Sequence, residues 1–146
     1  MKSVYTTALT LAIAAAGLVG CESEGSYKPA AQPTQLAAYA ATVSYPKDQT
    51  PTLNPRIVAE VNSSTGDIVL RNFGNEPLKN FTLWVNQSYL LHVDMLDGNN
   101  RRMIGKELLY NSGGTNMADV EAKSITKVQY QDENGKLFDV EGPQIY

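Results

Sequence analysis

The stretch that decides the fold is SITKVQYQDENGKLFDV, residues 124–140. Two runs rich in β-branched and aromatic residues flank a group of turn-forming residues, 132–135. Within that group, Asn134-Gly135 is a strong signal for a two-residue turn, because both residues tolerate positive φ angles. The stretch therefore predicts a β-hairpin, with one strand ending near Gln131 and the next beginning near Lys136.

Similar β-rich runs recur along most of the chain. They cover residues 56–61, 67–73, 80–86, 89–95 and 106–110, and turn clusters rich in Gly, Asn, Ser and Asp separate most of them. Strands at spacings near ten residues are typical of a sandwich or barrel. We therefore predict an all-β fold, a small antiparallel β-sandwich over residues 38–146. Its first strand is expected near residues 40–45, although residues 36–41 could instead start a short helix.

Alternation along the central runs predicts which side chains form the core. The inward set is expected to be Phe81, Leu83, Val85, Tyr89, Leu91, Val93, Met95, Val128 and Tyr130. Trp84 is out of phase with this set, so it should lie on the opposite face of its strand. The favoured interpretation is that neighbouring side chains and the amino-terminal segment cover Trp84. The alternative is an exposed indole that binds a partner, a role in which tryptophan is enriched.

The number and spacing of these runs resemble those of small immunoglobulin-like and fibronectin type III-like sandwiches. The cysteine pair of antibody domains has no counterpart, because Cys21 is the only cysteine. The resemblance implies an architecture alone, since unrelated functions share such folds.

The first 20 residues have the composition of a cleaved signal peptide. Lys2 provides a positive start, and Thr10 alone interrupts the apolar and small residues from Ala8 to Val19. This run is shorter than the roughly 20 residues that a transmembrane helix requires. We therefore expect residues 1–20 to be removed.

Leu18-Val19-Gly20-Cys21 resembles the lipobox of bacterial lipoproteins. The resemblance implies cleavage between Gly20 and Cys21, attachment of fatty acyl chains to Cys21, and a place in the cell envelope. Two or three acyl chains make a stable membrane anchor, whereas one chain binds only reversibly. Glu22 stands where this family uses aspartate for retention in the inner membrane, so the outer membrane is favoured. Residues 21–37 are expected to be the lipidated cysteine and a flexible tether with a reach on the order of 20 Å.

The charge of the chain argues against nucleic acid as a partner. The formal net charge is −3. Arg101-Arg102 is the largest cluster of basic residues along the sequence, whereas phosphate binding needs a basic face. The membrane, reached through the lipid on Cys21, and an envelope protein or polysaccharide are the expected partners.

Candidate catalytic residues are few. His92 is the only histidine, and Asp94 at i+2 would share its strand face. No G-x-S-x-G elbow accompanies them. The acid pairs Asp94/Asp97 and Asp132/Glu133 are interpreted as solvated turn or surface residues rather than as metal ligands. We therefore expect a non-catalytic domain with no cofactor and no metal, and the alternative is an envelope hydrolase that uses carboxylates with His92.

Overall fold

The computed structural model describes residues 26–146. Its strands are β1 (Thr52–Val61), β2 (Ile68–Asn72), β3 (Leu78–Val85), β4 (Tyr89–Leu96), β5 (Asn100–Ile104), β6 (Val128–Gln131) and β7 (Leu137–Ile145). Helix α2 (Pro33–Thr42) precedes the strands, and the short 3-10 helices η2 (Lys106–Leu108), η3 (Met117–Asp119) and η4 (Ala122–Ser124) lie between β5 and β6. The predicted signal peptide, the cleavage site and Cys21 lie outside the described residues. No helix within residues 26–146 has both the length and the apolar character needed to cross a bilayer.

The strands form one sheet in the order β4-β3-β6-β7-β1-β2-β5. All neighbouring pairs are antiparallel except β1 and β7, which run parallel. The predominantly β, sandwich-like fold predicted from the sequence is confirmed. The β1–β7 pair is the one departure from the predicted antiparallel arrangement. The turn of the β6–β7 hairpin makes β7 antiparallel to β6, and β1 lies on the other side of β7 and runs in the same direction as β7.

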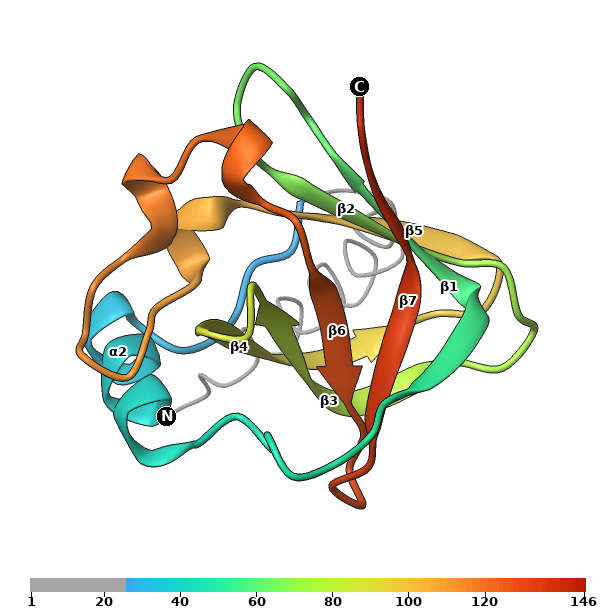
Figure 1. Cartoon of the computed structure of the whole chain (residues 1–146), viewed down its shortest axis with the longest axis horizontal. Helices are drawn as coiled ribbons and strands as arrows, with labels where there is room; N and C mark the ends of the chain where they lie inside the picture. The colour runs from blue at the N-terminus through green and yellow to red at the C-terminus, as the bar shows by residue number, and fades with distance from the viewer. Residues whose placement is uncertain (1–25) are drawn as a thin grey trace, which may run out of the picture.

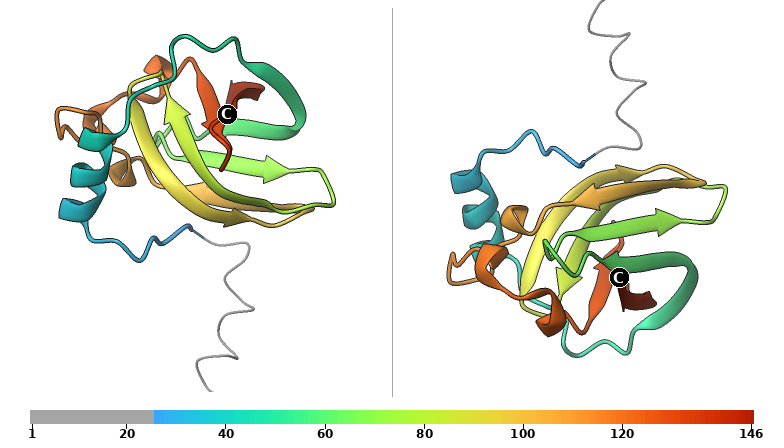
Figure 2. Two further views of the ribbon diagram at one scale, coloured as in Figure 1. Left: turned by 90° about the horizontal axis from the view of Figure 1, so that it is seen from below. Right: turned by 90° about the horizontal axis from the view of Figure 1, so that it is seen from above.

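The sheet is strongly curled around its core. Strands β4 and β5 are the two ends of the sheet order, yet only residues 97–99 connect them. Their adjacent ends must therefore lie close together, since an extended chain spans at most about 3.6 Å per residue. Figures 1 and 2 show how the curved strands enclose the interior, with α2 on the outside beside β4. The main core fills the inside of this curl.

The predicted alternation on β3 is confirmed. Phe81, Leu83 and Val85 belong to the main core, while Trp84 belongs to a second buried cluster on the outer face. On β4 the prediction is wrong at one position, because Leu96 and not Met95 enters the main core. The physical reason lies in the partner strand. Asn80 has a φ of 48°, outside the β region, and does not pair with β4, so the alternation from Phe81 onward does not extend to the pair Leu78–Leu96.

The predicted hairpin is confirmed, and Gln131 pairs with Leu137 across it. Its turn is longer than the two residues expected. Gly135 has a φ of 86° and donates its N–H to the Asp132 carbonyl, while the Asp132 carboxylate accepts from the backbone N–H groups of Asn134 and Lys136. The Asp132 side chain thus favours a turn with one left-handed residue at Gly135, rather than a turn that needs positive φ at two positions.

The predicted strand over residues 106–110 is wrong. Within this range, Lys106–Leu108 form η2, and Tyr110 contributes isolated bridges to Leu90 and Asn116. The strand in this region is β5 instead, at residues assigned partly to a turn. Its charged residues obscure the β pattern, yet exposed charges are usual on an edge strand because they discourage pairing with other chains.

The amino-terminal prediction also needs correction. Residues 33–42 form a helix, so the predicted tether over residues 33–37 and the strand at 40–45 are wrong, whereas the alternative of a short helix at residues 36–41 is confirmed. Pro33 stands at the first turn, where its missing N–H costs nothing, and the Gln35 side chain accepts from the Gln32 N–H. Leu36 and Ala40, one helical turn apart, are buried against the sheet. This burial, which composition does not reveal, holds the segment in place.

Candidate functional site

A pocket of about 430 Å³ lies between the amino-terminal segment and strand β4. We call it the α2–β4 pocket. Its lining consists of Tyr27, Pro29, Ala30, Ala31, Gln35, Leu36, Tyr39, His92 and Asp94. Most of these side chains are apolar, and a few polar groups converge among them, as in many binding sites for small molecules or for a partner's side chain.

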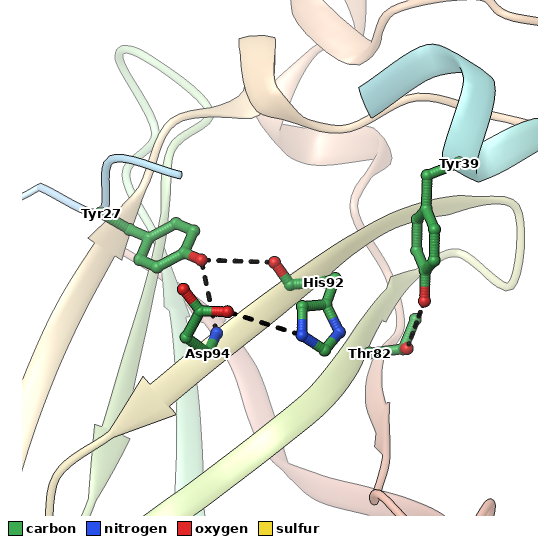
Figure 3. A network of polar contacts seen from close by, with 5 residues as sticks. All are labelled: Tyr27, Tyr39, Thr82, His92 and Asp94. Carbon is green, nitrogen blue, oxygen red and sulfur yellow. Dashed lines mark hydrogen bonds and ion pairs between the residues drawn. The ribbon is translucent and has the colours of Figure 1, made fainter. Parts of the chain in front are cut away.

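Tyr27 forms one wall of the pocket, and both its hydroxyl and its ring make contacts that hold it in place. Its hydroxyl donates to the His92 carbonyl at 3.4 Å and accepts from the Asp94 N–H at 3.3 Å (Figure 3). The Arg102 guanidinium lies 5.7 Å from the centre of its ring. Burial raises the pKa of the Tyr27 hydroxyl above its usual value of 10.0, and the hydrogen bond from Asp94 opposes this rise. The phenol is therefore neutral at physiological pH and acts as a structural group.

His92 and Asp94 lie on the outer face of β4, where strand alternation places both side chains. The His92 Nε2 and Asp94 Oδ1 atoms are 3.6 Å apart, which is too long for a hydrogen bond. The two side chains are 40% and 72% exposed, so water reaches both. The pair can therefore offer a hydrogen-bond donor and a carboxylate to a ligand, without the tight coupling of a catalytic dyad.

Tyr39 brings helix α2 to the other side of His92. Its ring meets the imidazole edge to face, with 6.1 Å between the ring centres (Figure 3). The Tyr39 hydroxyl lies 3.4 Å from Oγ1 of Thr82, which is the cross-strand neighbour of His92. Since Tyr39 is 37% exposed, it presents an aromatic surface to a ligand while it still fixes the helix.

The titratable and nucleophilic groups in the lining of the α2–β4 pocket are few. Asp94 is the one carboxylate in the lining, and no serine or cysteine side chain lines the α2–β4 pocket. Nucleophilic catalysis usually places a serine or cysteine within hydrogen-bond reach of a base. No group of three His, Cys, Asp or Glu side chains within residues 26–146 is placed to hold a metal ion.

Trp84 lies elsewhere and is buried, with 2% of its surface exposed. Ala40 from α2, Leu90 and Leu137 surround it, and Tyr45 meets the indole edge to face at 5.3 Å. The prediction that the amino-terminal segment covers this face is confirmed. The alternative, an exposed indole that anchors a partner, is wrong because α2 and the residues after it occupy that position.

The other sequence candidates do not join the α2–β4 pocket. Asp132 stabilises the β6–β7 turn, and Glu133 is exposed beside it. The sequence does not predict the roles of Tyr27 and Tyr39, because the composition of their segment favours a tether followed by either a strand or a short helix. One available signal was the spacing of Leu36 and Ala40 after Pro33, which suits a short helix with one buried face.

Comparison with known proteins found no match, whether among protein-family models, curated proteins or solved structures.

Proposed function

We propose that this chain is a lipid-anchored protein of the bacterial cell envelope, and that its β domain binds or positions another envelope component without catalysis. The observation that carries the binding role is the α2–β4 pocket, in which an apolar lining surrounds the two tyrosines, His92 and Asp94. Such a lining can take an apolar or aromatic group, and the polar atoms can orient it. The ligand is accordingly a side chain of an envelope protein or a part of an envelope polysaccharide.

The anchor in this proposal is supported by the lipobox-like residues 18–21 and the signal-like run ahead of them. Cys21→Ser should release the protein from the membrane fraction or leave it as an uncleaved precursor. The measurement is incorporation of a labelled fatty acid, together with the mass of the mature chain. If the wild-type protein incorporates no fatty acid, the anchor is wrong. Fractionation of the two membranes tests the preference for the outer membrane.

The binding role can be tested by filling the pocket without removing core contacts. Ala30 lines the pocket and is exposed, so Ala30→Trp should occupy the space at little cost to folding. Ala38→Trp is the matched control, because Ala38 is exposed on α2 and is not part of the lining. A component that co-purifies from solubilised envelopes with the wild type and with Ala38→Trp should be lost with Ala30→Trp. Equal recovery with both variants would contradict a role for the pocket.

A hydrolase that acts through His92 and carboxylates is the alternative. It would need a second carboxylate near His92, and Asp94 is the one acid in the lining. Paired carboxyl groups in glycosidases stand about 5–9.5 Å apart across the scissile bond. The non-catalytic proposal is therefore preferred. Loss of an envelope-hydrolysing activity in His92→Gln, with binding unchanged, would favour the hydrolase instead.

A further inference from the structure

A second hollow, of about 330 Å³, lies on the outer face of strands β2 and β5. Arg71 and Arg101 both line it, and they stand directly opposite each other in the antiparallel pair. Like charges directly opposite each other destabilise a sheet. An anion between the two guanidinium groups would relieve this repulsion and accept charge-assisted hydrogen bonds from them. We call this hollow the basic groove.

The charge of the basic groove is only partly neutralised. Arg71 Nε lies 3.1 Å from Glu60 Oε1 in a partly buried ion pair. Within residues 26–146, no carboxylate lies within ion-pair distance of Arg101, which is exposed. Residues 26–146 as a whole are acidic on balance: without Lys2, Glu22 and Glu24, the sequence has 11 basic side chains, Arg71 and Arg101 included, and 13 acidic ones. The positive charge is therefore local to this face.

Apolar side chains stand beside the arginines. Phe73, which also lines the groove, is 62% exposed, and Met103, two residues after Arg101 on the same face of β5, is 38% exposed. Asn72, Asn99 and Asn100 complete the lining with amide groups. Basic groups flanked by exposed aromatic and aliphatic side chains suit a membrane interface, where phosphates meet the outer part of the acyl chains.

The start of the described chain is fixed to the same strand. Ser26 forms a parallel bridge with Met103, and the Tyr27 N–H donates to the Met103 carbonyl at 2.7 Å. Cys21 is five residues before Ser26 in the sequence, which corresponds to at most about 18 Å of extended chain. A lipid on Cys21 would therefore keep this edge of the sheet close to the bilayer.

We propose that the basic groove, with Phe73 and Met103, rests on the bilayer surface and binds the phosphate groups of anionic lipid headgroups. The inference depends on the proposed lipid anchor for its geometry and adds a second point of attachment. An anchor with one additional basic surface is a common way to hold a domain in one orientation on a membrane. Each arginine near an anionic surface contributes about 1 kcal/mol, which corresponds to about a fivefold shift towards the docked orientation.

The test uses the acylated mature protein reconstituted into vesicles. A cysteine introduced by Phe73→Cys provides a thiol for an environment-sensitive fluorophore, since Cys21 is the only native cysteine and in the acylated protein its thiol would carry the lipid. Asn134→Cys, in the exposed β6–β7 turn, is the matched control. Lipids with a quencher in the acyl chain should quench the label at position 73 and leave the label at position 134 nearly unaffected. This difference should be largest in vesicles containing phosphatidylglycerol and should decrease in high salt.

Charge reversal makes the test specific to the groove. Arg101→Glu should shift the docked fraction at least fivefold towards the undocked state and reduce quenching at position 73. Lys127→Glu makes the same change of charge at an exposed position in the loop before β6 and should have little effect. Similar quenching at positions 73 and 134, or equal effects of the two charge reversals, would overturn the proposal.

Two further arms separate the remaining possibilities. If inorganic phosphate without vesicles changes the fluorescence at position 73 and anionic vesicles add no quenching, the groove binds a free anion and the membrane proposal is wrong. If the mass of the purified chain shows no acyl group, the proposed anchor fails. In that case, flotation of the unacylated protein with anionic vesicles tests the basic groove without the anchor. Salt-sensitive binding that Arg101→Glu removes would support the proposal that the groove binds anionic lipids, and an absence of binding would overturn that proposal.

Discussion

The backbone N–H of Tyr27 donates a hydrogen bond of 2.7 Å to the carbonyl of Met103, so the amino-terminal segment lies along the outer edge of β5. The hydroxyl of Tyr27 reaches the main chain of β4, where it contacts His92 and Asp94. Strands β4 and β5 are the two ends of the sheet order. Tyr27 therefore joins both edges of the curled sheet and uses backbone groups that would otherwise be available to another chain.

This bridging role predicts that Tyr27 contributes to stability, although the composition of its segment favours a tether. Tyr27 is 6% exposed. Tyr27→Ala should lower the free energy of unfolding by roughly 3–5 kcal/mol, as for other large buried aromatic residues. Tyr27→Phe keeps the ring and loses only the hydroxyl contacts, so it should cost about 1 kcal/mol. Urea unfolding of both variants gives the comparison. A negligible loss for Tyr27→Ala would mean that the segment does not belong to the domain.

Alkaline pH should destabilise the domain through Tyr27 and Tyr130. Burial raises the pKa of both hydroxyls above 10.0, while hydrogen bonds from the Asp94 backbone and from Asn54 partly oppose the rise. Each phenol is neutral in the folded state at a pH where the unfolded chain already releases its proton. The contribution of these two phenols to the free energy of unfolding is thus fully present below about pH 10. It is lost as pH rises through the pKa values of the two groups in the folded state.

The expected measurement is the thermal midpoint between about pH 8 and pH 11.5, a range that spans the ordinary tyrosine pKa. Lysines also lose their charge there, so the test is the difference between variants. Tyr27→Phe and Tyr130→Phe should each make the fall of the thermal midpoint above about pH 10 shallower than in the wild type. Tyr146→Phe is the matched control, because Tyr146 is 59% exposed. A decline that is identical in all three variants would contradict the role of the buried phenols.

Trp84 should behave as a core residue. Trp84→Ala is expected to lower the free energy of unfolding by roughly 3–5 kcal/mol, since the indole is buried among Ala40, Leu90 and Leu137. Phe73→Ala is the control on an exposed ring and should change stability by about 0.5 kcal/mol or less. Thermal or urea unfolding distinguishes them. If Trp84→Ala unfolds like the wild type, the helix does not cover this face in solution.

The β-rich fold and the faces of its central strands could be predicted from the sequence. Period-two alternation in β3 and the turn residues after Gln131 are local signals, and each depends on a few neighbouring residues. The curl of the sheet could not be predicted in the same way. It depends on pairings between distant segments, such as β1 with β7, for which no local pattern exists.

The α2–β4 pocket was predictable only in part. Alternation placed His92 and Asp94 on one face, and the structure confirms this. The opposite wall comes from a segment rich in Ala, Pro and Gln, whose composition indicates a linker. A few contacts, those of Tyr27, Leu36 and Ala40, outweigh that composition because they complete a surface that the sheet leaves uncovered.

Asn86, in the turn between β3 and β4, contacts the long segment that precedes β6. Asn86 has a φ of 51°, in the left-handed region. Its side-chain Nδ2 donates to the Ser124 carbonyl at 2.7 Å, and its Oδ1 accepts from the N–H groups of Thr126 and Lys127 at 2.9 and 3.1 Å. One residue therefore both forms the turn and fixes the loop that leads into β6.

Two substitutions at this position should separate the two roles. Asn86→Ala removes the side-chain hydrogen bonds. It also puts alanine, which tolerates a positive φ less well than asparagine does, into the left-handed backbone. The free energy of unfolding should therefore fall by about 2–4 kcal/mol. Asn86→Gly also removes the hydrogen bonds but suits the left-handed backbone, and its loss should be about 1 kcal/mol smaller. Urea unfolding measures both values. Equal losses would mean that the backbone conformation contributes nothing, and two negligible losses would mean that the loop is held by other contacts.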